Sequence, residues 1–153
     1  MIWFRIDNRL VHGQIIEAWL PYTRAVRLIV CNAELADDAL RQQIMQLAIP
    51  SRISVSFLAP GDLEAALKSS PKTEGKTLVL FADCQDAQAA YSSGTRFASL
   101  NIGNMHYAPG KKQICPHVAL SEGDSDCLKA FAKAGVTLDF RCVPNDIVTC
   151  AGW

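Results

Sequence analysis

The sequence lacks features that would place it in several common functional classes. Its 15 basic and 15 acidic residues leave no net charge, so no overall field attracts nucleic acid or an anionic membrane. No apolar run approaches the roughly 20 residues that cross a bilayer. The first residues also lack the basic start and apolar core of a signal peptide. We therefore expect a cytoplasmic protein that binds no nucleic acid and is not embedded in a membrane.

The six cysteines lack the spacing of a metal or redox site. None forms a C-x-x-C pair or a Cys/His cluster with zinc-site spacing, so we expect them to act as small hydrophobic residues. The glycines form neither G-x-G-x-x-G nor a P-loop motif, which argues against a nucleotide-binding domain. The sequence thus predicts no metal and no cofactor.

The chain does contain a regular alternation of apolar runs and amphipathic stretches. Strands are predicted over 2–6, 26–31, 53–58, 77–81, 97–102 and 136–143, with another near 113–115 or 118–120. Helices are predicted over about 13–20, 37–48, 62–67, 83–92 and 121–134, the first of them ended by Pro21. Residues 68–76 and 103–110 are predicted loops. This alternation predicts one α/β domain over 1–153, with an open, doubly wound, mostly parallel sheet and helices on both faces.

His12 stands at the junction between the first predicted strand and the first predicted helix, in the run RIDNRLVHGQ over residues 5–14. In a parallel sheet such a junction gathers helical N–H groups that can hold an anion. Imidazole exchanges protons near neutral pH, so its neutral, nucleophilic form is available to accept a phosphoryl group. The run therefore predicts a small phosphocarrier, and the alternative is an ordinary loop histidine.

Two charged residues close to His12 are candidates for the same chemistry. Arg9 presents a planar fork of donors that suits two phosphate oxygens; alternatively it is a solvated arginine paired with Asp7. Asp7 is compatible with three roles: it can hold the second ring N–H of His12, pair with Arg9, or cap the loop backbone. The sequence leaves these roles open.

Four uncharged residues are predicted to help bind phosphate. Gly13 permits close approach of a phosphate to the backbone, and the N–H groups of Gly13 and Gln14 supply the positive end of the helix. Asn8 and Asn101 are lesser candidates, Asn101 because it ends a strand at the sheet edge where ligands collect.

Other aromatic and histidine residues have weaker functional signals. His106 lies in a predicted loop and suits a surface or partner-facing position, and His117 lacks surroundings comparable to those of His12. Trp19 and Tyr22, near the end of the first helix, are expected to be partly exposed and to belong to an interface.

The motif Asp7-x-Arg9-Leu10-x-His12-Gly13-Gln14 resembles the phosphorylation motif of the IIB components of the mannose/fructose/sorbose class of bacterial sugar phosphotransferase systems. The segments at 100–103, 134–136 and 143–144 resemble later landmarks of that family, so the resemblance covers nearly the whole chain. It implies a phosphotransferase with a phosphohistidine intermediate. Such a protein takes the phosphoryl group from the histidine of a IIA partner and passes it to a sugar held by the membrane components IIC and IID.

The resemblance also implies roles for single residues. His12 matches the histidine that the family phosphorylates on Nδ1, and Arg9 and Asp7 match the motif arginine and aspartate. Many members carry a second acid where this chain has Asn8, so no acidic role is implied there. No IIA domain is recognised in the chain, so the donor is expected to be a separate polypeptide. The alternative function is a regulatory component that signals through the phosphorylation state of His12 without sugar transport.

Overall fold

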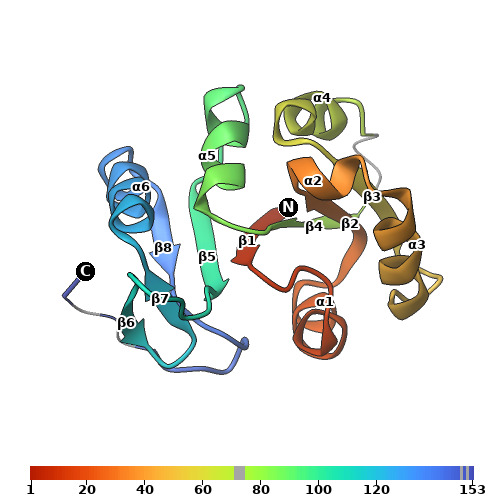
Figure 1. Cartoon of the computed structure of the whole chain (residues 1–153). Coiled ribbons are helices and arrows are strands. Elements are labelled where there is room, and N and C mark those ends of the chain that lie inside the picture. The colour runs from red at the N-terminus through yellow and green to blue at the C-terminus, as the bar shows by residue number, and fades with distance from the viewer. Residues whose placement is uncertain (71–74, 149, 151) are drawn as a thin grey trace.

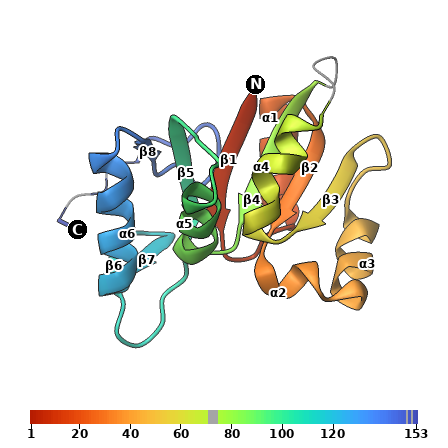
Figure 2. The same cartoon turned by 90° about the horizontal axis from the view of Figure 1, so that it is seen from above.

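The computed structural model describes residues 1–70, 75–148, 150, 152 and 153. Six parallel strands form one sheet in the order β3-β2-β4-β1-β5-β8, and β6 and β7 form a separate antiparallel pair (Figures 1 and 2). The strands are β1 (Ile2–Asp7), β2 (Ala25–Cys31), β3 (Ser54–Leu58), β4 (Lys76–Phe81), β5 (Ser99–Asn104), β6 (Lys112–Cys115), β7 (Val118–Leu120) and β8 (Thr137–Asp139). The predicted open, doubly wound parallel sheet is confirmed.

Helices cover both faces of this sheet, and each face has its own apolar core. The helical segments are η1 (Ile15–Trp19), α1 (Leu20–Thr23), α2 (Ala33–Ala36), α3 (Ala39–Ala48), η2 (Pro60–Asp62), α4 (Leu63–Lys68), α5 (Cys84–Ser92) and α6 (Glu122–Lys133). Buried side chains of η1, α1 and α2 pack on one face, and those of α4, α5 and α6 pack on the other. Among the described residues, no helix is both long and apolar enough to cross a membrane.

The central strand β1 carries two charged residues inside this apolar architecture. Side chains alternate between the two faces of a strand, and Phe4 and Ile6 belong to the core beneath α4, α5 and α6. Arg5 and Asp7 therefore point to the opposite face, toward η1. β1 pairs with β4 over most of its length but with β5 only from Arg5 onward. The chain leaves β1 toward η1 on one face of the sheet and leaves the neighbouring strand β5 toward α6 on the other. The carboxyl end of β1 therefore lies where two connections diverge, the usual position of a ligand site in such folds.

The first helix does not end at Pro21, contrary to the sequence prediction. Helical structure continues to Thr23 and ends at Arg24, whose φ of 54° is left-handed. Immediately before the proline, η1 is a π-helix, in which the N–H of Leu20 donates to the carbonyl of Ile15 five residues back. A new α-helical segment begins at Leu20, so Pro21 occupies a first turn, where its missing N–H costs no helical hydrogen bond.

The last predicted strand, over 136–143, is also shorter in the structure. β8 pairs with β5 only through Thr137–Asp139. In the residues that follow, carboxylate side chains accept hydrogen bonds from the backbone N–H groups. Asp139 accepts from the N–H of Arg141, and Asp146 accepts from the N–H groups of Cys142 and Val143. These side-chain contacts replace ladder hydrogen bonds and turn the segment into a loop.

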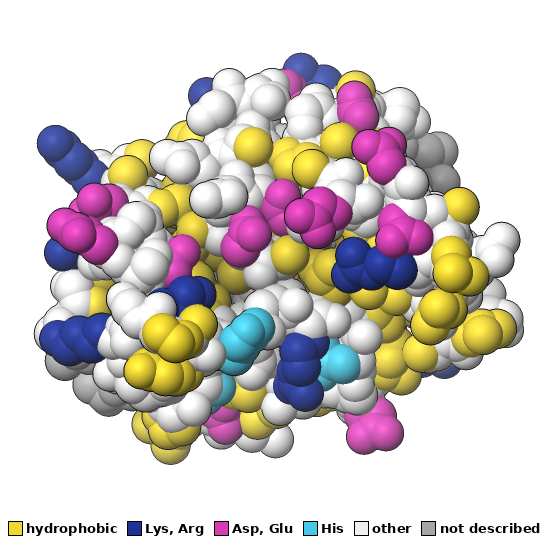
Figure 3. All heavy atoms as spheres, viewed as in Figure 1, with side chains coloured by type: hydrophobic (Ala, Val, Ile, Leu, Met, Phe, Trp, Pro, Cys, Tyr) yellow, Lys and Arg dark blue, Asp and Glu magenta, His cyan; other side chains and the backbone are white. Residues whose placement is uncertain are grey.

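Three further sequence predictions are refined by the structure. Both candidates for the extra strand exist, as β6 and β7, whereas the predicted loop 103–110 begins later because β5 continues to Asn104. Part of the predicted loop 68–76 lies outside the described residues, at 71–74. The helix predicted over 37–48 forms as α3, and the separate short helix α2 precedes it. Leu40, Ile44 and Leu47 on α3 face solvent, where Figure 3 shows hydrophobic side chains gathered at the surface.

Candidate functional site

The loop after β1 is built to deliver His12 to the start of a helix. The N–H of Leu10 donates to the carbonyl of Asp7 (2.9 Å) and closes a turn. Leu10 has a left-handed φ of 55°, a conformation that a leucine adopts only when its surroundings impose it. Here the imposing contact is burial, because the Leu10 side chain packs into the core beside η1. The carbonyl of His12 then accepts the first helical bonds, from Ile15 and Ile16.

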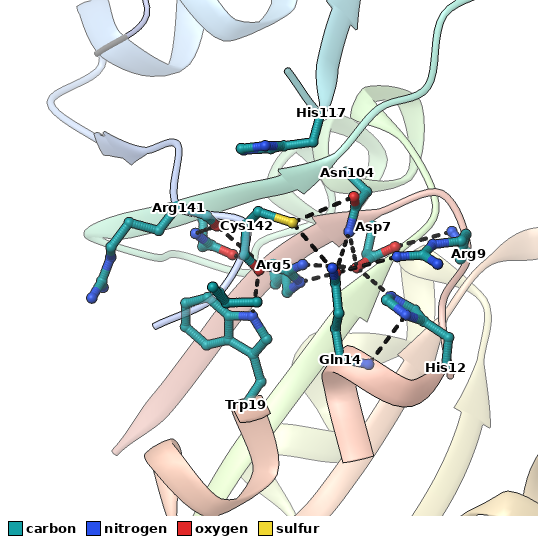
Figure 4. A network of polar contacts seen from close by, with 12 residues as sticks. Arg5, Asp7, Arg9, His12, Gln14, Trp19, Asn104, His117, Arg141 and Cys142 are labelled. Atoms are coloured by element: carbon teal, nitrogen blue, oxygen red, sulfur yellow. Dashed lines mark hydrogen bonds and ion pairs between the residues drawn. The ribbon is translucent and has the colours of Figure 1, made fainter. Parts of the chain in front are cut away.

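Asp7 is the centre of the polar network at this end of the sheet (Figure 4). Its side chain is 0% exposed. Oδ2 accepts hydrogen bonds from Nε and a terminal nitrogen of Arg5 (3.2 and 2.9 Å), from Nδ2 of Asn104 (3.0 Å) and from Nε2 of His12 (2.8 Å). Oδ1 accepts from the backbone N–H of Arg9 (3.1 Å). Asp7 therefore holds the imidazole and caps the loop backbone at once, but its guanidinium partner is Arg5, not Arg9.

The surroundings of Asp7 keep its carboxylate ionised despite burial. Burial by itself raises the pKa of a carboxyl group. The hydrogen bond with His12, the charge of Arg5 and the hydrogen bond with Asn104 outweigh it and hold the pKa of Asp7 below its ordinary value. Arg5 experiences the reverse balance, because burial lowers its pKa and the Asp7 carboxylate opposes that effect. The pair is an ion pair inside the protein.

Arg5 occupies a space that only glycine opposite it permits. Its side chain is 1% exposed, and its guanidinium lies over the ring of Trp19, 4.8 Å from the ring centroid. A Cβ atom on Gly103, in the neighbouring strand β5, would lie 1.9 Å from Cζ of Arg5.

Trp19 is only 1% exposed, so the prediction that it is partly exposed is wrong; Tyr22, at 45%, is exposed as predicted.

The contacts of His12 determine which ring nitrogen is available. An ionised carboxylate only accepts hydrogen bonds, so Nε2 of His12 carries the proton that it donates to Asp7. In the neutral ring the lone pair therefore lies on Nδ1, which faces the backbone N–H of Gln14 at 3.4 Å. The His12 side chain remains 12% exposed. The site thus presents one specified nucleophilic nitrogen beside the first turn of a helix.

Arg9 and Gln14 flank His12 and are linked to each other. The Arg9 guanidinium donates to Oε1 of Gln14 (3.2 Å), and Arg9 is exposed, so its remaining donors are accessible. Oε1 of Gln14 also accepts from Nδ2 of Asn104 (3.0 Å) and lies 3.4 Å from Sγ of Cys142. Gln14 therefore connects the arginine to the buried network through its side chain as well as offering its backbone N–H.

The remaining predicted phosphate-binding residues differ in their position. At Gly13 an added Cβ would meet no protein atom within 4 Å, which leaves open space next to His12. The Asn8 amide contacts the ring of His106. Asn101 accepts from Arg5 and donates from Nδ2 to the carbonyls of Asp139 and Arg141. Because Asn101 is buried and its donors are used internally, its placement supports a structural role and not phosphate binding.

Sequence reasoning missed Arg5 and Asn104, which are both essential to this geometry. Arg5 carried a detectable signal, because a charge in the middle of a buried strand needs a partner, and Asp7 stands on the same strand face two residues later. Asn104 carried none, because its contact with Asp7 depends on the register between β1 and β5, in which Asp7 lies opposite Asn104.

Comparison with known proteins gives one consistent result. A family model described as the PTS system sorbose subfamily IIB component matches residues 1–150. The sorbose-specific EIIB component of Klebsiella pneumoniae is 34% identical over 143 residues, which cover 93% of this chain and 87% of that protein. The mannose-specific EIIAB component of Escherichia coli is 29% identical over 143 residues, which cover 93% of this chain and 44% of that protein.

Solved structures match the whole fold. The IIBSor domain of the sorbose permease from Klebsiella pneumoniae superposes with a TM-score of 0.86 at 32% identity, over 98% of this chain and 93% of that one. The N-acetylgalactosamine-specific IIB component 1 from Escherichia coli superposes with a TM-score of 0.90 at 28% identity, over 96% and 97%.

The space around Arg5 predicts opposite outcomes for two glycine substitutions. We expect Gly103→Ala to lower the free energy of unfolding by about 1–3 kcal/mol, because the new methyl group displaces a buried guanidinium. Gly13→Ala, which meets open space, is the matched control and should change it by less than about 0.5 kcal/mol. Urea unfolding of both variants measures the difference, and equal effects would contradict the described packing.

Removing the charge of Asp7 should destabilise the fold in a pH-dependent way. Asp7→Asn leaves Arg5 buried without its counter-ion, which we expect to cost about 3–5 kcal/mol at neutral pH. Because the folded-state pKa of Asp7 lies below the ordinary 3.8, its stabilisation is fully present above that value and is lost as the pH falls through the folded-state pKa.

Urea unfolding of the wild type and the variant from neutral to acidic pH tests this sign. The difference in free energy should shrink on acidification, whereas a difference that stays constant or grows would refute the ionised pair. The control Glu64→Gln removes a surface ion pair with Lys68 (2.7 Å) and should cost less than about 1 kcal/mol.

Proposed function

Because this chain belongs to the sorbose subfamily of PTS IIB components, we propose that it is a cytoplasmic phosphocarrier whose acceptor is His12. It receives a phosphoryl group from a phosphorylated IIA protein or domain and transfers it to a sugar during uptake through the membrane components IIC and IID. The observation that carries the proposal is the Asp7–His12 hydrogen bond, which leaves Nδ1 of the neutral ring unprotonated. The names of two relatives, EIIB and EIIAB, support the IIA partner. This chain matches only 44% of the length of the EIIAB protein, whose name joins a IIA to a IIB component.

The first transfer exchanges one P–N bond for another. The in-plane lone pair of Nδ1 attacks phosphorus and forms a new N–P bond, while the bond to the donor imidazole breaks and its electron pair returns to the donor nitrogen. The His12 ring keeps its Nε2 proton and becomes positively charged. Asp7, which already accepts that proton in a hydrogen bond of 2.8 Å, stabilises this charge without giving up or taking a proton.

The transferred group carries negative charge on its peripheral oxygens, and the donors that can bind them surround Nδ1. The backbone N–H of Gln14 points toward that nitrogen, the space at Gly13 is open, and the Arg9 guanidinium is held nearby through Gln14. Phosphoryl transfer depends mainly on alignment and charge stabilisation. Figure 3 shows histidine and basic side chains near each other on one face of the molecule, which a donor protein can approach.

The second transfer reverses the first toward a sugar. A sugar hydroxyl oxygen attacks phosphorus, the N–P bond breaks, and the hydroxyl proton passes to solvent. The Nδ1 lone pair is restored, so the ring returns to the neutral tautomer that Asp7 selects. His12 thus acts as a nucleophile in one step and as a leaving group in the next, with the same hydrogen bond in place.

Labelling tests the acceptor directly. A phosphoenolpyruvate-driven donor cascade that ends in phospho-IIA should give an acid-labile phosphoryl adduct on the wild-type chain and none on His12→Gln. The other two of the chain's 3 histidines provide the controls, since His106→Gln and His117→Gln retain the acceptor and should still be labelled. An acid-stable adduct, or labelling of His12→Gln, would contradict the proposal.

The geometry of the Arg9 side chain should matter as much as its charge. We expect Arg9→Ala to keep its fold, because this side chain is exposed, and to slow phosphorylation of His12 by about 100-fold. Arg9→Lys keeps the charge but lacks the planar fork, so its rate should be intermediate. Arg52→Ala removes another exposed arginine and serves as the control. Equal rates for all four proteins, measured by rapid quench, would remove Arg9 from the mechanism.

A further inference from the structure

Three side chains with metal-binding atoms meet close to the candidate site, although they are far apart in the sequence. His117 lies in the turn between β6 and β7, and Cys142 and Asp146 lie in the loop after β8. A ring nitrogen of His117, Sγ of Cys142 and a carboxylate oxygen of Asp146 all lie within 4.8 Å of one another. Figure 4 shows His117 facing Cys142 across this space.

We propose that these residues form a binding site for one zinc ion. Nitrogen from imidazole, sulfur from thiolate and oxygen from carboxylate are the ligands that Zn²⁺ takes in proteins, whereas Mg²⁺ and Ca²⁺ prefer oxygen alone. The thiolate and the carboxylate together supply two negative charges, which balance the charge of a divalent ion. Three protein ligands leave a fourth tetrahedral position for water.

The geometry requires only a small contraction. Zinc lies about 2.0–2.3 Å from each ligand, so the ligand atoms of a tetrahedral site are roughly 3.3–3.7 Å apart. With the ligand atoms no more than 4.8 Å apart, shifts of about 1 Å bring all three into the coordination sphere. The chain segment that carries two of the ligands is a loop, so such shifts break no sheet hydrogen bond.

Contacts around the cluster orient its ligands as the supporting contacts of metal sites do. Nε2 of His117 donates to the carbonyl of Phe140 (3.0 Å), which leaves the lone pair of the neutral ring on Nδ1. Oδ2 of Asp146 accepts from the N–H groups of Cys142 (2.9 Å) and Val143 (3.0 Å). The carbonyl of Cys142 accepts from Nε1 of Trp19 (2.8 Å). These bonds fix the histidine tautomer, the carboxylate and the cysteine backbone.

Cavities reach two of the three proposed ligands, His117 and Asp146. A cavity of 430 Å³ is lined by Pro116, His117, Asp146, Ile147 and Val148. His117 also lines a second cavity, of 320 Å³, together with Asn8 and Arg9. The cluster therefore lies between open space and the candidate phosphoryl site, which it meets through the 3.4 Å contact between Cys142 and Gln14.

The sequence predicted no metal site. The positions of the three proposed ligands along the chain explain why sequence analysis did not find this cluster. Cys142 lies in a segment predicted as a strand, Asp146 lies four residues later and beyond the end of that segment, and the histidine precedes both by two strands and a helix, β7, α6 and β8. Only the folded chain, in which the turn between β6 and β7 packs beside the loop after β8, brings the three together.

Metal binding to the purified, reduced and chelator-treated full chain tests the site. Calorimetric titration with Zn²⁺ should give one ion per chain, and Co²⁺ used as a probe should produce a sulfur-to-cobalt charge-transfer band. We expect Cys142→Ser to abolish that band and to weaken Zn²⁺ binding by about 100-fold. His117→Gln, which keeps the thiol, should weaken binding by about tenfold or more.

Matched substitutions outside the cluster keep the test specific. Cys150→Ser and His106→Gln should bind Zn²⁺ as the wild type does, and circular dichroism confirms that every variant is folded. Unchanged binding by Cys142→Ser, loss of binding in Cys150→Ser, or a stoichiometry other than one would overturn the assignment. These readouts need no phosphoryl donor, so failure of the metal site and failure of the phosphocarrier role are distinguishable.

Discussion

The buried carboxylate of Asp7 is the contact on which the rest of the structure around His12 depends. It ends the central strand, neutralises Arg5 inside the protein, caps the loop at Arg9 and holds the ring proton of His12. A single side chain thereby connects the interior of the sheet to the ring of His12. Because its pKa is held low, it stays a pure acceptor, and the imidazole has one tautomer that satisfies it.

Arg5 connects the same point to distant parts of the chain. It contacts Asn101 on β5 and the carbonyl of Arg141 after β8, and it lies over Trp19 from the first helical segment. Gly103 leaves the room for it. The loop that supplies Cys142 and Asp146 is therefore held by the same arginine that pairs with Asp7. The candidate phosphoryl site and the proposed zinc site share this support.

Much of the fold followed from local patterns, whereas much of the site did not. The apolar run of β4 and the amphipathic pattern of α6 are short-range signals, and both predicted elements are confirmed. The prediction that the first helix ends at Pro21 was wrong because a π-helix precedes the proline and places it in a new first turn. The strand predicted over 136–143 is too long because Asp139 and Asp146 accept hydrogen bonds from backbone N–H groups that a strand would use for pairing. The roles of Arg5, Asn104 and Asn101 depend on strand register, which no local pattern encodes.

The central claim is that the Asp7 carboxylate selects the ring proton of His12 and so leaves Nδ1 as the nucleophile. Nitrogen-15 NMR of the histidine ring in the unphosphorylated protein, recorded at a pH at which the ring is neutral, measures this directly. We predict that Nε2 carries the proton, with the shift of a protonated nitrogen, and that Nδ1 has the shift of an unprotonated one. A neutral ring protonated on Nδ1, or an equal mixture of the two tautomers, would contradict the account.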